Sequence, residues 1–228
     1  MIEKKRTFYL GLGLLFGFVV VLVSFFSPIW DGKDGLEYLD NLYNSISKGS
    51  AYYIPKIREE AESLKGKRVE LTLDMADERH AEQAALLLEA GEAQVASAGA
   101  RLNVEGDLGH ILANCLSDAD AMYHNEGRQI SAKYHCDERL AMYNWWLALK
   151  GAEKDLKKQN KFKEAKVVDL IVKKAIETSY NYYQIDPQKI TDRLGIVIFS
   201  LVFYVIYTVW YGFAIMFLFE GWGLRLAH

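Results

Sequence analysis

The residues best suited to chemistry lie close together in the stretch CLSDADAMYHNEGRQISAKYHCDE. Asp120 and His124 are four residues apart, so on a helix they would share one face. Together with His135 they are candidate ligands of a metal ion, because zinc sites use histidine, cysteine and carboxylate side chains. The stretch lacks the paired, repeated spacing of established metal motifs. Metal or redox chemistry is therefore the last of the interpretations considered for it.

Cys115 and Cys136 flank the same stretch and have two other interpretations. A disulfide between them would close a loop of about 20 residues and stabilise the fold by roughly 3 kcal/mol in the chain-entropy description. We expect this bond if the stretch lies outside the cytoplasm, where thiols are oxidised. Two free, buried thiols are the alternative.

The rest of the chain shows no catalytic pattern. His80 and His110 lie near acidic residues, but no Ser-His-Asp set, nucleophile elbow or phosphate-binding glycine loop can be assembled around them. The formal net charge is −3, and a mildly acidic protein is poorly suited to bind nucleic acid. We therefore predict no cofactor and no nucleic-acid partner.

Two uncharged apolar stretches, 7–30 and 194–219, bracket the chain. A helix needs about 20 apolar residues to cross a bilayer, and both stretches exceed this length. Neither contains an ionisable side chain, which disfavours an ion or proton pathway. The first stretch is longer than the apolar core of a signal peptide, and no A-x-A cleavage motif follows it. We therefore expect two transmembrane helices, the first of them an uncleaved anchor.

The basic run KKR at positions 4–6 precedes the first stretch, and such residues favour the cytoplasmic side. Lys189 and Arg193 argue for the opposite orientation, but the first helix usually dominates. This predicts an inner-membrane protein whose central domain is extracytoplasmic, as in a periplasmic domain. The predicted organisation is a cytoplasmic end at 1–6, a span at 7–30, an extramembrane domain at 31–193, a span at 194–219 and a short cytoplasmic end at 220–228.

Both spans carry patterns that indicate helix packing. Gly13 and Gly17 have the GxxxG spacing that lets another backbone approach closely. Tyr204, Tyr207 and Tyr211 lie on one helix face near the middle of the second span, where a hydroxyl group needs a partner other than lipid. We expect these five residues to contact protein. Contact of the tyrosines with a quinone, a haem or a lipid is the alternative.

The middle of the chain changes between strand and helix periodicity. Asp77 and Asp107 are each placed to cap a helix, and a helical pattern begins at Asp137. The expected elements are a strand at 67–73, a helix at 78–89, a strand or hairpin bent at Gly99 over 94–105, a helix from 108 to about 120 and helix from 138 onward. The predicted fold class is a mainly α membrane protein whose two spans flank an α+β domain with a small sheet.

The last part of this domain, 137–183, is helical in pattern throughout. It forms either one long helix or an antiparallel pair of helices, because the run KDLKKQNK in its middle has few apolar residues. We favour a turn near Asn160.

These features suit a non-catalytic accessory or structural subunit of a larger membrane complex. Its expected contacts are the lipid bilayer and other membrane protein subunits, and a second copy of the chain is also possible. Trp145 and Trp146 are residues of the type enriched at interfaces. The alternative is an extracytoplasmic ligand-binding sensor that signals through a partner. A metal-binding enzyme ranks third.

Overall fold

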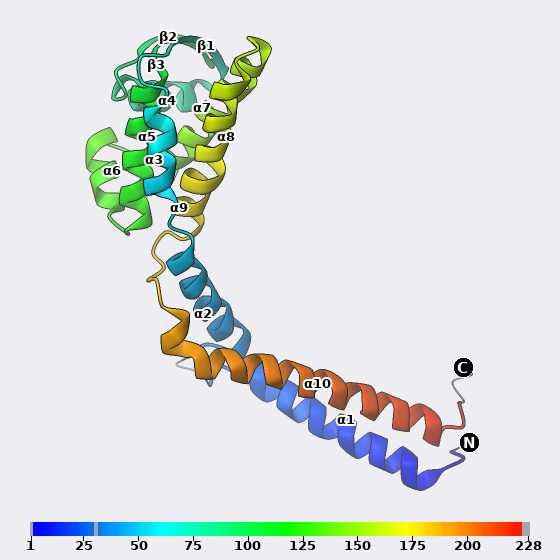
Figure 1. Ribbon diagram of the computed structural model, residues 1–228. Helices are drawn as coiled ribbons and strands as arrows, with labels where there is room; N and C mark the ends of the chain where they lie inside the picture. Colours follow the sequence, from blue (N-terminus) through cyan, green and yellow to red (C-terminus); the bar gives the residue numbers. More distant parts are fainter. Residues whose placement is uncertain (1, 30–31, 225–228) are drawn as a thin grey trace. The chain divides into compact units, whose positions relative to one another are not determined.

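The computed structural model describes residues 2–29 and 32–224, and these fold into two compact units (Figure 1). The central unit comprises Ser50–Asp186, and the hairpin unit comprises Met1–Gly49 together with Pro187–His228. Helices predominate and one small sheet is present, which confirms that part of the predicted fold class. The outermost parts of the predicted segments, at 1, 30–31 and 225–228, lie outside the described residues.

The sheet of the central unit has three antiparallel strands in the order β1-β3-β2. β1 is Arg68–Asp74, β2 is Gln94–Ala98 and β3 is Arg101–Asp107. Alternate side chains of β1 are buried, as its sequence pattern predicts. β2 and β3 form the predicted hairpin, and Gly99 turns it with a φ of +61°.

Eight helical segments complete the central unit. They are α3 (Ile54–Glu62), α4 (Glu78–Glu89), α5 (Leu108–Tyr123), α6 (Gly127–Tyr134), α7 (Glu138–Lys158), α8 (Phe162–Ile171), the π-helix η1 (Val172–Ile176) and α9 (Glu177–Asn181). The carboxylates of Asp77, Asp107 and Asp137 accept backbone hydrogen bonds at the starts of α4, α5 and α7. The chain turns at Asn160, where φ is 60°, so the predicted antiparallel pair is confirmed and the single long helix is not formed.

One hydrophobic core joins the sheet to the helices of the central unit. Trp145 on α7 belongs to it and is fully buried, so its predicted role as an interface residue is wrong. Trp146, the next residue, is only partly buried. Neighbours in an α-helix point about 100° apart, so only one of the two indole rings can face the core.

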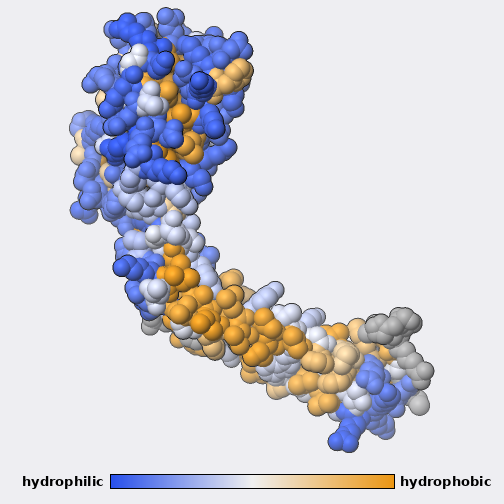
Figure 2. Space-filling model, in the orientation of Figure 1, coloured by the Kyte–Doolittle hydropathy of each residue, from blue (hydrophilic) through white to orange (hydrophobic). Residues whose placement is uncertain are grey.

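The hairpin unit contains α1 (Lys5–Phe25), α2 (Gly35–Ser50), the short 3₁₀ helix η2 (Ile190–Arg193) and α10 (Leu194–Gly221). α1 and α10 are antiparallel, because the amides of Glu3 and Lys4 donate to the carbonyl of Gly221 at 3.0 and 3.1 Å. At 1.5 Å per residue the two helices are about 31 and 42 Å long. Both are long and apolar enough to cross a membrane, and Figure 2 shows apolar residues along their surface.

α2 belongs to the hairpin unit although it lies within the predicted extramembrane domain. The Tyr43 hydroxyl is 2.6 Å from Ser200 Oγ on α10, and the Gln188 amide donates to the Ser45 carbonyl at 3.1 Å. Gly35, at the start of α2, lies against the ring of Phe25 on α1. The predicted domain at 31–193 is therefore wider than the central unit, which spans Ser50–Asp186.

Candidate binding site

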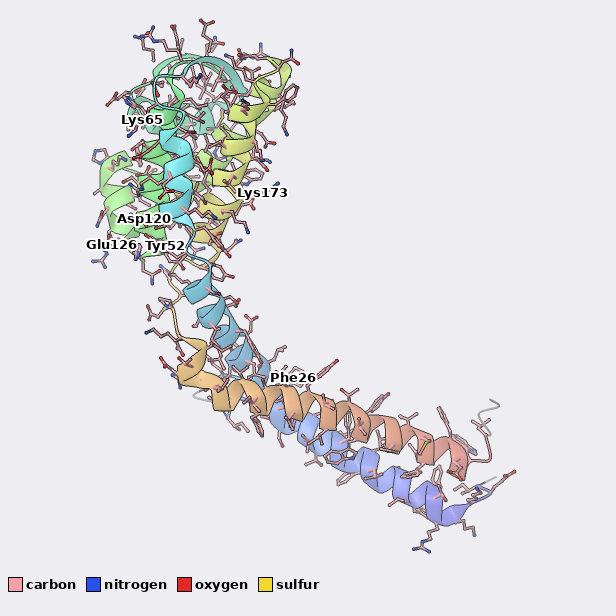
Figure 3. All side chains as sticks on the ribbon, viewed as in Figure 1. Phe26, Tyr52, Lys65, Asp120, Glu126 and Lys173 are labelled. Carbon is pink, nitrogen blue, oxygen red and sulfur yellow. The ribbon has the colours of Figure 1, made fainter. Side chains whose placement is uncertain are left out.

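The three candidate metal ligands do not come together as a site. The carboxylate of Asp120 accepts hydrogen bonds from the Tyr52 hydroxyl at 2.8 Å and from Arg58 Nη2 at 3.4 Å, and Figure 3 shows Tyr52 beside it. His124 Nδ1 lies 3.3 Å from the same carboxylate, while His135 is the left-handed residue that ends α6. Among the described residues, no three His, Cys, Asp or Glu side chains are placed to hold a metal. Asp120 instead joins α3 to the end of α5.

The hydroxyl of Tyr52 is perturbed by this contact. Partial burial and the hydrogen bond to the Asp120 carboxylate raise the pKa of Tyr52 to about 12. The ring of Tyr52 also lies 4.9 Å from that of Tyr123 and 5.2 Å from that of His124. The cluster is a structural contact at the start of α3, and its polar atoms are paired with one another.

Cys115 and Cys136 are both free thiols, so the predicted disulfide is not formed. Cys115 lies on α5 inside the core and is fully buried, whereas Cys136 lies between α6 and α7 and packs against the core from its edge. Although the two cysteines are close in the sequence, their sulfur atoms do not form a bond. Burial, and then the charge of Asp118, raises the pKa of the Cys115 thiol well above its usual value. Burial also raises the pKa of Cys136.

We expect iodoacetamide to modify both thiols of the unfolded protein without prior reduction, which intact mass spectrometry can count. In the folded protein, Cys115 should react roughly tenfold more slowly than Cys136, because a buried thiol of high pKa carries little thiolate. Full protection of both thiols in unreduced, unfolded protein would show a disulfide and contradict this arrangement.

Asp118 is the centre of a buried polar network beside Cys115. Its carboxylate accepts hydrogen bonds from the Tyr134 hydroxyl at 2.6 Å, from Trp145 Nε1 at 2.9 Å and from Lys133 Nζ at 2.8 Å. Asn114 extends the network, because its amide donates to the Tyr134 oxygen at 3.1 Å. Burial and the Asp118 charge raise the pKa of Tyr134. With three donors on one carboxylate, the network joins α5, α6 and α7 and is structural.

The feature best suited to bind a partner is an apolar cleft of 190 Å³ in the central unit. We call it the aromatic cleft. One wall comes from α7, and the other comes from the end of η1 and from α9. Its lining residues are Met142, Tyr143, Trp146, Ile176, Glu177, Tyr180 and Asn181.

Contacts on both sides hold the aromatic wall of this cleft in place. Tyr143 and Trp146 are one helical turn apart on α7, and their rings stack with centroids 6.1 Å apart and planes at 10°. Trp146 Nε1 donates to Glu177 Oε1 at 2.9 Å, which connects the two walls. On its other side Tyr143 meets the ring of His80, whose Nδ1 is 2.7 Å from Oδ1 of the buried Asn144.

The second wall depends on the π-helix. In η1, Val172–Ile176, the backbone is wound more loosely than in α8 before it and α9 after it. A π-turn changes the direction in which the following residues point, and Glu177 and Tyr180 follow it directly. Ser179 nearby is fully buried, and its Oγ has no hydrogen-bond partner among the described residues. Such irregular turns often occur at functional sites.

The aromatic cleft is open to its surroundings and is lined mainly by aromatic and apolar side chains. Tyr143 is 41% exposed and Tyr180 is 36% exposed, so the rims of both walls are open. Glu177 is its one carboxylate, and this group already accepts the indole hydrogen bond. From the sequence, Trp146 was singled out only as a residue of the type enriched at interfaces. Glu177 and Tyr180 were not, because their direction follows from the π-turn and not from regular helical spacing.

Of the residues predicted to pack in the two apolar helices, some contact the other helix of the hairpin and others are exposed. The ring of Trp210 approaches Gly17, and Tyr207 stacks on Phe18 with centroids 4.2 Å apart. Tyr211 also meets Phe18, at 5.0 Å. A side chain at Gly13 would meet nothing within 4 Å, and among the three glycines of α1 it is Gly11 that lies against the backbone of α10.

Tyr204 differs from the other two tyrosines of the predicted stripe. Its side chain is 69% exposed, so it lies away from α1. Gly13 is likewise exposed on the surface of α1. Part of the predicted packing surface therefore contacts the other helix of the hairpin, and the rest, including Gly13 and Tyr204, is exposed.

Comparison with family models, curated proteins and solved structures finds no match to the chain.

Proposed function

We propose that the protein is a non-catalytic, membrane-anchored subunit that binds a partner protein through the aromatic cleft. The observation that carries this proposal is the cleft itself, an apolar hollow of 190 Å³ with two open aromatic rims. Aromatic side chains in preformed hollows are typical anchors of protein interfaces. The expected partner inserts one apolar side chain between Tyr143 and Tyr180.

In this proposal α1 and α10 form a hairpin across the inner membrane. Their antiparallel pairing brings Lys4 and Glu220 together, with Nζ and Oε1 2.7 Å apart, so both ends of the hairpin lie on one side. The basic residues at 4–6 favour the cytoplasm for this side. The central unit would then be extracytoplasmic. Gly13 and Tyr204, which α1 and α10 leave uncovered, are available to a helix of the partner.

The test is purification of the tagged full chain from its own membranes in mild detergent, with quantitative mass spectrometry of the accompanying proteins. We expect Tyr143→Ala to reduce the amount of the partner roughly tenfold or more, because it removes an anchor of the interface. Phe162→Ala is the matched control, since Phe162 is an aromatic residue 61% exposed outside the cleft. It should leave the partner in place.

Two results would overturn the proposal. In one, no protein accompanies the wild type, or the same protein accompanies wild type and Tyr143→Ala equally. In the other, an apolar small molecule saturably raises the thermal midpoint of the wild type but not of Tyr143→Ala, and no protein partner is found. The second result would favour the ligand-binding sensor, which would use the same hollow.

A further inference from the structure

The hairpin unit contains an apolar cavity of 270 Å³ that packing within the chain leaves unfilled. It lies where the end of α1 and the starts of α2 and α10 meet. Its walls include Val21, Phe25, Leu39, Ile196, Phe199 and Phe203. Phe199 is 62% exposed, so the cavity opens to the surroundings on the side of α10.

The hydroxyl groups in this wall are already engaged. Ser24 Oγ donates to the Val20 carbonyl at 2.9 Å, and Ser200 Oγ donates to the Val197 carbonyl at 2.9 Å. Ser200 Oγ is also 2.6 Å from the Tyr43 hydroxyl. Because these oxygen atoms have partners, the cavity presents almost only carbon atoms, which suits a hydrocarbon occupant.

A second hollow, of 200 Å³, adjoins the first at Tyr38, which lines both. The lining of this hollow is about half polar and includes the two cationic side chains Lys33 and Arg193. Arg193 Nε donates to Gln188 Oε1 at 2.8 Å, which holds the guanidinium in place. Lys33 Nζ lies 4.0 Å from Glu37 Oε1, which is a loose contact.

We propose that the two hollows form one site for an anionic phospholipid of the surrounding bilayer. An acyl chain would occupy the apolar cavity, and the phosphate would lie between Lys33 and Arg193. Arg193 immediately precedes α10, which places its charge at the end of the apolar span, where headgroups lie. The inference rests on the proposed membrane anchoring of α1 and α10.

The test is native mass spectrometry of the purified full chain with added dioleoyl phosphatidylglycerol or dioleoyl phosphatidylcholine. We expect the anionic lipid to bind roughly 30-fold more tightly, since both basic side chains attract an anionic headgroup. The double variant Lys33→Gln/Arg193→Gln should lose this preference. Ile196→Trp, which fills the apolar cavity, should weaken binding of both lipids.

The matched control is Lys163→Gln/Arg79→Gln, which removes one lysine and one arginine exposed on the central unit. It should keep the preference of the wild type. Equal binding of the two lipids by the wild type, or an unchanged preference in Lys33→Gln/Arg193→Gln, would overturn the site. Alkaline carbonate extraction of membranes distinguishes failure of the lipid-site proposal from failure of the proposed membrane anchoring. A protein that leaves the membrane contradicts the anchoring, whereas one that stays but shows no lipid preference contradicts the site alone.

Discussion

Asp118→Ala is expected to destabilise the central unit by about 3–5 kcal/mol, the usual cost of removing one partner from a buried ionic network. Its carboxylate, 3% exposed, accepts hydrogen bonds from Tyr134, Trp145 and Lys133. Without it, the indole N–H of the fully buried Trp145 loses its acceptor inside the core. Thermal unfolding of the full chain in detergent, followed by circular dichroism, should show a midpoint lowered by roughly 10 °C or more.

The control for this variant is Asp120→Ala, two residues later on the same helix. The Asp120 carboxylate is 29% exposed and pairs with Arg58 at 3.4 Å and His124 at 3.3 Å. Exposed ion pairs contribute about 0–1 kcal/mol to the free energy of unfolding, so the thermal midpoint of Asp120→Ala should fall by no more than about 4 °C. Equal shifts for the two variants would show that the Asp118 network does not support the fold.

Gly11→Leu is expected to separate the two helices of the hairpin. A Cβ at Gly11 would lie 2.7 Å from the Leu218 amide nitrogen and 3.0 Å from the Ala214 carbonyl oxygen, both backbone atoms of α10. Because backbone cannot give way as a flexible side chain can, α1 must move outward. The ion pair between Lys4 and Glu220 at the same end should then be lost.

The measurement uses the double variant Lys4→Cys/Glu220→Cys in a chain whose two natural cysteines are replaced. A short bismaleimide joins the new thiols, and proteolysis between the helices leaves the two fragments connected only if the cross-link has formed. Gly11→Leu should lower the yield of the cross-linked product about tenfold, since overpacking destabilises the contact between α1 and α10 by about 1–3 kcal/mol. Gly13→Leu makes the same change where nothing lies within 4 Å. A cross-link retained in Gly11→Leu, or lost equally in both, would contradict the helix contact.

Local signals made much of the fold predictable. The caps at Asp77 and Asp107 act within a few residues of their own position, and the sequence placed both helix starts correctly. The helical pattern from Asp137 also begins where α7 begins, but the cap that Asp137 provides was not predicted. Gly99 and Asn160 could likewise be identified as turns, because glycine and asparagine tolerate the positive φ that both residues adopt. The apolar spans follow from length and composition alone.

Features that depend on distant parts of the chain could not be predicted. Cys115 and Cys136 suggested a bond by their spacing, yet one lies inside the core and the other at its edge. The glycine of α1 that lies against α10 is set by how the two helices rotate against each other, so the contact of Gly11 with the α10 backbone was missed. The aromatic cleft was missed because the π-turn interrupts the periodicity from which its second wall could be identified.

Photo-cross-linking from the aromatic cleft in intact membranes tests the proposed partner binding most directly. A photoreactive phenylalanine at Tyr180, on the open rim, should give one discrete adduct with a partner protein. The same residue at Phe162, which is exposed outside the cleft, should not give it. No protein adduct from Tyr180, or the same adduct at equal yield from both positions, would contradict a partner-binding role for the cleft.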